Sequence, residues 1–159
     1  MKIHITQGVG EGKTKVSAYD AGLRDAGIHN YNLLYLSSVI PDNTELVKAK
    51  PEPKDNEHGW KLYAVVSEKH AAVPEEEAWA GIGWVFYKET KRGLFVHGEG
   101  SSELEVVASI KDTLEDMMFQ RGGEYGEIDY EVIGITCKDK PVCAIVSAVY
   151  ESENWNGNK

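Results

Sequence analysis

The sequence predicts an α+β fold, a sandwich of mainly antiparallel sheet covered by helices. Two observations lead to this prediction. Hydrophobic periodicity along the chain changes in the order strand, helix, strand, three strands, helix and two strands. The 159 residues, 42% of them hydrophobic, suffice for a single domain over residues 1–159 that buries roughly 70% of its unfolded surface.

The N-terminal segment predicts a strand that runs into a flexible loop. Lys2 to Gln7 alternates apolar and polar residues, and Gly8, Gly10 and Gly12 follow it. This glycine run lacks the G-x-G-x-x-G spacing of a phosphate loop, and Glu11 would repel a phosphate. We therefore expect a strand-to-helix connection here and no nucleotide site.

The next segment predicts a helix and a second strand. Thr14 is placed as an N-cap and Gly27 as a C-terminal stop, with apolar residues at helical spacing between them. Asn30 to Leu36 predicts a strand that ends at Ser37 and Ser38, with three buried leucines, Leu33, Leu34 and Leu36.

The middle of the chain predicts a surface excursion followed by strands. Residues 42–60 carry turn and breaker residues and little hydrophobic pattern. Three segments rich in Val, Ile and aromatic residues then predict strands, Lys61 to Ser67, Trp79 to Lys88 and Gly93 to Glu99. The second of them lacks a polar face, so we expect it to be central in a sheet.

The C-terminal part predicts a long helix and two strands. Ser102 and Glu105 form a capping box that opens the helix, and Gly122 ends it. The helix carries an apolar stripe that we expect to pack on the core, Leu104, Val107, Ile110, Leu114 and Met117 or Met118. Two strands follow, Ile128 to Thr136 and Val142 to Tyr150, and the polar tail after them is expected to fray.

Composition and charge exclude several classes of partner. The formal net charge of -9 repels phosphate backbones, so nucleic acid is excluded as a partner. The start of the chain lacks the apolar core of a secretory signal, and no apolar run could span a bilayer, so we expect a cytoplasmic protein without membrane contact. Cys137 and Cys143 are expected to be reduced thiols on neighbouring strands. Four histidines lie without ligand spacing, so no metal site is predicted, His4, His29, His58 and His70.

The one motif that stands out is the serine pair Ser37-Ser38, placed between the apolar strand and Pro41. From spacing alone, two hydroxyls at the end of a strand are local hydrogen-bonding groups. The residues around the pair favour a functional role for it over this local one.

The segment from Gly8 to Pro41 resembles the pyruvoyl-dependent arginine decarboxylases. The resemblance lies in the runs Ser17 to Leu23, Asp25 to Ile28 and Asn32 to Pro41, and it continues more loosely through Gly93 to Val96 and the helix after it. It implies the αββα sandwich of that family. It also implies homo-trimers, often paired into hexamers, with each active site built between neighbouring subunits.

The resemblance implies that the chain cleaves itself between Ser37 and Ser38, into residues 1–37 and 38–159. Ser38 Oγ would attack the Ser37 carbonyl, and elimination with loss of ammonia would leave residue 38 as a covalent pyruvoyl cofactor. A Schiff base between this group and the substrate α-amine would then convert arginine to agmatine and carbon dioxide.

Two further positions match the family's site. Asn32 would serve as an oxyanion donor or substrate contact, although a polar strand residue can equally satisfy nearby backbone. Asp20 would bind the substrate guanidinium through its carboxylate, although a helical aspartate can equally be a solvated surface residue.

One departure from the family pattern concerns the catalytic acid. His97 stands where the resemblance places a glutamate, and Glu99 follows two residues later, on the same face of a regular strand. Three alternatives are open: His97 replaces the acid, Glu99 supplies it by a local shift, or the chain is slow, altered in substrate or unprocessed. We predict that His97 and Glu99 form the acid site jointly.

Two other functions are kept as alternatives. One is a pyruvoyl decarboxylase for another amino acid. The other is an unprocessed, non-catalytic homologue that binds a cationic amino acid or a partner.

Overall fold

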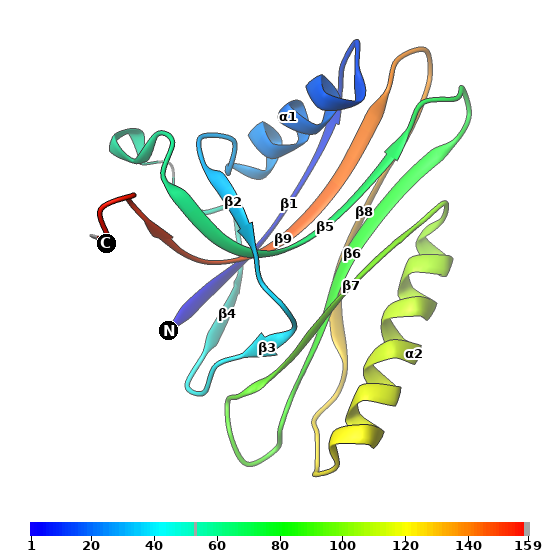
Figure 1. The fold of residues 1–159 in the computed structure, drawn as a ribbon. Helices are drawn as coiled ribbons and strands as arrows, with labels where there is room; N and C mark the ends of the chain where they lie inside the picture. The colour runs from blue at the N-terminus through cyan, green and yellow to red at the C-terminus, as the bar shows by residue number, and fades with distance from the viewer. Residues whose placement is uncertain (53, 158–159) are drawn as a thin grey trace.

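The structure is a computed structural model that describes residues 1–52 and 54–157. Two β-sheets lie face to face, and one helix covers the outer face of each, which confirms the predicted αββα sandwich (Figure 1). In these residues one sheet has the strand order β2-β5-β9-β1-β4, and the other has the order β3-β7-β6-β8. We call them the first and the second sheet.

The first sheet is built around two long strands, β1 (Lys2–Glu11) and β9 (Val142–Glu153), which pair antiparallel. On the other side of β9 lies β5 (Lys61–Ala71), also antiparallel. Two short strands pair parallel at its edges, β2 (Asn32–Tyr35) with β5 and β4 (Glu45–Lys48) with β1. The sheet is therefore mainly antiparallel, as predicted.

The second sheet has β6 (Glu77–Phe86) between β7 (Gly93–Gly100) and β8 (Asp129–Thr136). This confirms the central position predicted for the apolar segment from Trp79. The two-residue strand β3 (Val39–Ile40) pairs with the beginning of β7 and forms the edge. Beyond this short pairing, most of β7 lies at an open edge of the sheet within the described chain.

The apolar core lies between the two sheets and beneath each helix. Large side chains from both sheets meet in the middle layer, among them Ile3, Val65, Ile82 and Phe95. The helix α2 (Glu103–Arg121) packs on the second sheet through Val106, Ile110 and Leu114, all fully buried. Placing Leu104 in this stripe was wrong: its side chain is 81% exposed, because it lies about 200° around the helix axis from Val106.

The glycine run near the N-terminus belongs to a strand and not to a flexible loop. The helix α1 (Lys15–Ala26) lies directly on β1, so a Cβ atom on Gly8 would be 2.4 Å from the Gly22 carbonyl oxygen. A Cβ atom on Gly10 would be 2.2 Å from the Ala18 carbonyl oxygen. The glycines are therefore required for close packing of strand and helix, and the predicted loop begins only at Gly12.

Two segments predicted to be irregular are paired. The excursion at 42–60 contains β4 and a short 3-10 helix, η1 (Asp55–Glu57), and β4 was missed because a short, charged edge strand has little apolar pattern. The tail predicted to fray continues β9 to Glu153, which pairs with Lys61. Beyond it, Trp155 Nε1 donates a hydrogen bond to the Gly59 carbonyl oxygen (3.0 Å).

Cys137 and Cys143 are both free thiols, as predicted. Within residues 1–52 and 54–157, neither helix has the length and apolar character needed to cross a membrane.

Candidate active site

The Ser37–Ser38 peptide lies where the chain passes from one sheet to the other. Before it, the Leu36 N–H donates to the Ala64 carbonyl oxygen on β5 (2.9 Å), which holds the chain on the first sheet. After it, the Ser38 carbonyl oxygen accepts from the Phe95 N–H on β7 (2.9 Å), which holds the chain on the second sheet. Ser37 is exposed and Ser38 is half-buried. The peptide is therefore held on both sides and reachable by solvent.

The residues around this crossover carry apolar side chains to the surface. Leu34, Tyr35, Leu36 and Val39 are between 37% and 58% exposed. The predicted burial of Leu34 and Leu36 was therefore wrong, and only Leu33 packs against the core, partly buried beneath α1. The reason is the edge position of β2, which leaves these side chains without a neighbouring strand in the described chain.

His97 and Glu99 lie side by side on β7, as their two-residue spacing predicts. His97 Nδ1 and Glu99 Oε1 are 2.8 Å apart, and both side chains are partly exposed. The hydrogen bond to Glu99 raises the pKa of His97, and the same bond lowers the pKa of Glu99. The hydrogen bond therefore favours the protonated form of His97 and the ionised form of Glu99.

A residue from the opposite sheet holds this pair in place. Ser67 on β5 is fully buried, and its Oγ donates to the Gly98 carbonyl oxygen (2.9 Å) and lies 3.2 Å from Glu99 Oε1. Ser67 Oγ also accepts a hydrogen bond from the Gly81 N–H (3.2 Å). Sequence reasoning missed Ser67, because a contact across two sheets leaves no periodicity signal in the chain.

The acid pair lies close to the crossover along the same strand. Phe95, which binds the Ser38 carbonyl oxygen, and His97 are two residues apart on β7 and so share a face of the sheet. A rise of about 3.3 Å per residue puts them roughly 7 Å apart along the strand. The structure therefore brings the serine pair and the acid pair to one region of β7.

Within one chain, Asn32 and Asp20 are held by other partners. The Asn32 side-chain amide donates to the Gly59 carbonyl oxygen (2.8 Å), at the opposite end of β2 from the serine pair. Asp20 forms an exposed ion pair with Arg24, one turn further along α1 (3.1 Å). Neither side chain has a described hydrogen bond to Ser38, His97 or Glu99.

A pair of tyrosines links the helix of Asp20 to the crossover. The hydroxyls of Tyr19 on α1 and Tyr35 on β2 are 3.1 Å apart. Burial and this hydrogen bond raise the pKa of Tyr19, and burial raises that of Tyr35. Both phenols are therefore neutral near pH 7, and they fix the side of α1 next to Asp20 against the strand that leads to Ser38.

Comparison with known proteins assigns the chain to a protein family. The model of the pyruvoyl-dependent arginine decarboxylase family matches residues 2–154. The chain belongs to this family. It is 34% identical over 140 residues to the pyruvoyl-dependent arginine decarboxylase of Thermococcus kodakarensis, with 87% of each chain covered. Over the same length and share it is 32% identical to the enzyme of that name from Pyrococcus furiosus. It is also 35% identical over 107 residues to that of Halobacterium salinarum, 67% of this chain and 66% of the relative.

The residues at the crossover fit the pyruvoyl group that the family name implies. Residue 38 is a serine, whose β-oxygen can attack the preceding carbonyl and later leave. Its own carbonyl oxygen, which would become the amide oxygen of a pyruvoyl group, is already bound by the Phe95 N–H. Ser38 is the residue in this family member that could carry the group.

Proposed function

We propose that this chain is a self-processing pyruvoyl-dependent decarboxylase that converts arginine to agmatine and carbon dioxide. The observation that carries the proposal is the position of Ser37–Ser38, a solvent-reachable peptide held on both sides where the chain changes sheets, in a member of this family. The names of the relatives support the substrate and the cofactor.

The proposed processing makes two chains. Ser38 Oγ attacks the Ser37 carbonyl carbon, the peptide C–N bond breaks, and an ester joins the two residues. Elimination then removes the Cα proton of residue 38, breaks the bond between Cβ and the ester oxygen, and releases a carboxylate on Ser37. The enamine left on residue 38 becomes an imine, and water hydrolyses this imine and releases ammonia, which leaves the ketone of a pyruvoyl group at the start of the chain 38–159.

The fragment 1–37 is expected to stay bound after cleavage. It contributes β1, α1 and β2, and β1 lies inside the first sheet between β9 and β4. Its helix also buries Leu23 and Ala26 against β5 and β9 residues. Separating the fragments would expose this core, so processing should leave the fold in place.

We propose that residues on β7 assist decarboxylation. The pyruvoyl group supplies a ketone that condenses with the substrate α-amine and a conjugated carbonyl that accepts the electrons released with carbon dioxide. The Phe95 N–H, which donates to the Ser38 carbonyl oxygen, would hold the corresponding oxygen of the group and would stabilise negative charge on it. His97, whose protonated form is favoured by the hydrogen bond to Glu99, would donate the proton that the substrate carbon needs in place of its carboxylate.

The remaining site residues are proposed to act across a subunit boundary. Asp20 already binds one guanidinium, that of Arg24, so its carboxylate is suited to the guanidinium of arginine. Asn32 would contact the substrate or an oxyanion. Exposed Leu34, Tyr35 and Val39 beside the open edge of β7 favour a homo-trimer or hexamer, in which a neighbouring chain completes each site.

A substrate panel tests this function. Processed protein is incubated with arginine, lysine, ornithine, aspartate and S-adenosylmethionine, and released carbon dioxide is measured. We expect arginine to be preferred, Ser38→Ala to be inactive, and the exposed helix variant Ser109→Ala to be unchanged. Preference for a substrate without a guanidinium would contradict the arginine assignment. An uncut, inactive wild-type chain would instead support the binding homologue.

Single replacements of His97 and Glu99 by Ala test the acid site. Both should lower the rate of decarboxylation. If neither does, the proposed role of the pair is wrong.

A further inference from the structure

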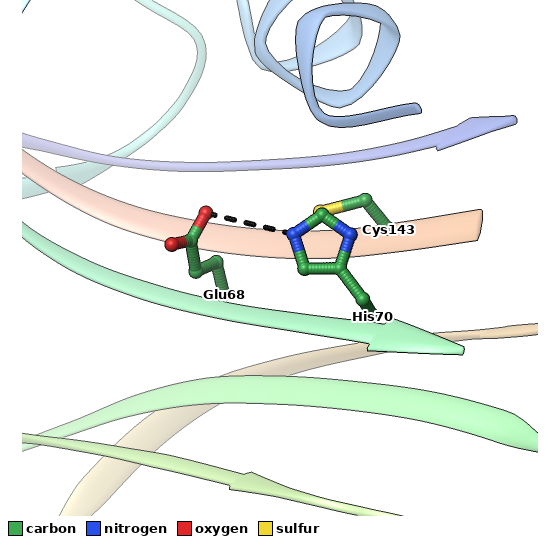
Figure 2. A group of neighbouring side chains, drawn as sticks. All are labelled: Glu68, His70 and Cys143. Atoms are coloured by element: carbon green, nitrogen blue, oxygen red, sulfur yellow. Dashed lines mark hydrogen bonds and ion pairs between the residues drawn. The ribbon is translucent and has the colours of Figure 1, made fainter. Parts of the chain in front are cut away.

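A second cluster of reactive side chains lies on the first sheet, near Tyr19 in the N-terminal half of α1 (Figure 2). It consists of Glu68 and His70 on β5 and Cys143 on β9. None of them has a role in the function proposed above. A carboxylate, an imidazole and a thiol are together a common set of metal ligands.

Strand geometry explains why the three side chains meet. Glu68 and His70 are two residues apart, so they point to the same face of β5. His70 and Cys143 are direct cross-strand partners in the antiparallel pair of β5 and β9. Spacing along the chain gives no ligand motif, because 73 residues separate His70 from Cys143. Only the strand register brings the sulfur to the imidazole.

The three potential ligand atoms lie within 4.8 Å of one another. His70 Nε2 is 3.7 Å from Cys143 Sγ and 4.0 Å from Glu68 Oε2. In a tetrahedral zinc site, bonds of about 2.1 Å to nitrogen, 2.3 Å to sulfur and 2.1 Å to oxygen put such atoms roughly 3.4 to 3.6 Å apart. The nitrogen–sulfur distance is about 0.1 Å longer than in such a site and the nitrogen–oxygen distance about 0.6 Å longer, and the sulfur–oxygen distance is at most about 1.2 Å longer, so the Glu68 carboxylate would move inward to hold an ion.

We propose that Glu68, His70 and Cys143 form a binding site for a divalent transition-metal ion of the zinc type. A set of one sulfur, one nitrogen and one oxygen ligand favours zinc or a similar borderline ion over magnesium or calcium, which prefer oxygen ligands. Three protein ligands leave the fourth position of a tetrahedral ion to water.

The surroundings of the cluster favour an ion that enters from solvent. The side chains of Glu68 and His70 are 38% and 26% exposed, so one side of the site is open, whereas Cys143 is buried. A divalent cation binds a cysteine as the deprotonated thiolate.

The imidazole of His70 presents one nitrogen to the site. Its Nε2 faces the thiol and the carboxylate, and its Nδ1 is buried without a hydrogen-bond partner among the described residues. The described polar contacts of this ring are therefore all directed into the cluster.

Cobalt binding tests the site directly, because a cobalt–thiolate bond gives a charge-transfer absorption band. Untagged full-length protein is freed of metal with a chelator, titrated with Co²⁺, and then titrated with Zn²⁺ in competition. We expect one ion per chain, a thiolate-to-cobalt band, and displacement of Co²⁺ by Zn²⁺. Cys143→Ser should abolish the band. His70→Gln should weaken Zn²⁺ binding by more than about 100-fold, since even the loss of a residue that only hydrogen-bonds to a metal ligand costs about 10- to 100-fold.

Matched controls separate this site from adventitious binding. Cys137→Ser changes the other buried cysteine and His29→Gln changes a histidine outside the cluster, so both should bind like the wild type. If Cys143→Ser does not fold, Glu68→Gln provides the test: Zn²⁺ should raise the Tm of the wild type and leave that of this variant unchanged. Absence of a band in the wild type, a band that persists in Cys143→Ser, or an equal Tm rise in Glu68→Gln would overturn the proposal.

Discussion

At the scale of single residues, the proposed chemistry depends most on the hydrogen bond between His97 and Glu99. Their 2.8 Å contact raises the pKa of His97 above its ordinary value of 6.5 and lowers that of Glu99 below 4.5. A histidine whose protonated form is favoured in this way can donate a proton where the family pattern has a glutamate. The substitution at this position is therefore compatible with catalysis when Glu99 accompanies it.

We predict that Glu99→Gln lowers the pKa of His97, because the amide removes the negative charge and the strongest hydrogen bond of the imidazolium. The measurement is an NMR titration of the His97 ring in the wild type and the variant. Glu127→Gln, an exposed change elsewhere on the surface, should leave the titration unaltered. An unchanged His97 pKa in Glu99→Gln would show that the pair does not interact in solution.

The same pair should contribute to stability within a defined pH window. The raised pKa of His97 contributes stability that is complete below pH 6.5 and is lost as the pH rises through the raised value. The lowered pKa of Glu99 contributes stability that is present above pH 4.5 and is lost as the pH falls through the lowered value. The difference in unfolding free energy between wild type and Glu99→Gln should thus be largest between these limits and shrink outside them.

Ser67→Ala should destabilise the protein by about 1 to 3 kcal/mol, because it removes a buried hydroxyl that joins the two sheets and leaves the Gly81 N–H without this acceptor. Urea unfolding measures the change. Ser109→Ala, on the exposed side of α2, should stay within about 0.5 kcal/mol of the wild type. Equal stability of the Ser67 and Ser109 variants would mean that the bridge contributes nothing.

Among the elements, the contact of β1 with α1 carries a strict steric requirement, because backbone meets backbone there. A Cβ atom on Gly10 would lie 2.2 Å from the Ala18 carbonyl oxygen and 2.3 Å from the Gly22 nitrogen. Backbone on both sides of the contact cannot yield as a flexible side chain would, so the helix must move away from the sheet. The glycines at this contact therefore set the distance between the two layers.

Gly10→Ala is expected to lower the free energy of unfolding by at least about 1 to 3 kcal/mol, the usual cost of overpacking. Gly126→Ala is the matched control, since its nearest neighbour would lie at an ordinary 3.7 Å and its φ angle suits alanine. Thermal unfolding of both variants decides the point. A Gly10 variant as stable as the Gly126 variant would mean that the helix is not seated on β1 as described.

The sequence predicted those elements whose apolar pattern reflects burial within the chain. Thr14 caps α1 and Gly27 ends it, and β6 is central as its lack of a polar face indicates. The errors have physical causes. Gly8 and Gly10 were predicted to form a loop because the sequence does not show that α1 packs directly on them. The strand β4 was missed because it lies at a sheet edge and carries charged residues.

Only those contacts of the candidate site that join residues close together in the sequence could be predicted from the sequence. The two-residue spacing of His97 and Glu99 on a strand places them together, and the pair is found. Ser67 and the cross-strand contact of His70 with Cys143 depend on which strands become neighbours. Positions along the chain do not contain that information, so the structure was needed to find them.

For the whole molecule, the separation of the site residues is the main consequence of the fold. Asp20 and Asn32 have partners away from Ser38 within one chain, while apolar side chains beside the crossover are exposed. Sites shared between subunits would account for both observations.

Mixing two inactive variants tests this arrangement. Asp20→Ala and His97→Ala are each expected to lose most of their activity as homo-oligomers. When they are unfolded together and refolded as a mixture, part of the activity should return, because some sites then receive Asp20 from one chain and His97 from another. A mixture as inactive as its parents, although mixed oligomers are present by native mass spectrometry, would place both residues in sites built from one chain.

The most direct test of the central claim, cleavage at the sheet crossover, is the denaturing intact mass of purified protein with and without borohydride. We expect two masses, corresponding to residues 1–37 and 38–159, and a gain of hydrogen on the larger fragment after reduction of its ketone. A single mass for the full chain, unchanged by borohydride after prolonged incubation, would contradict the account.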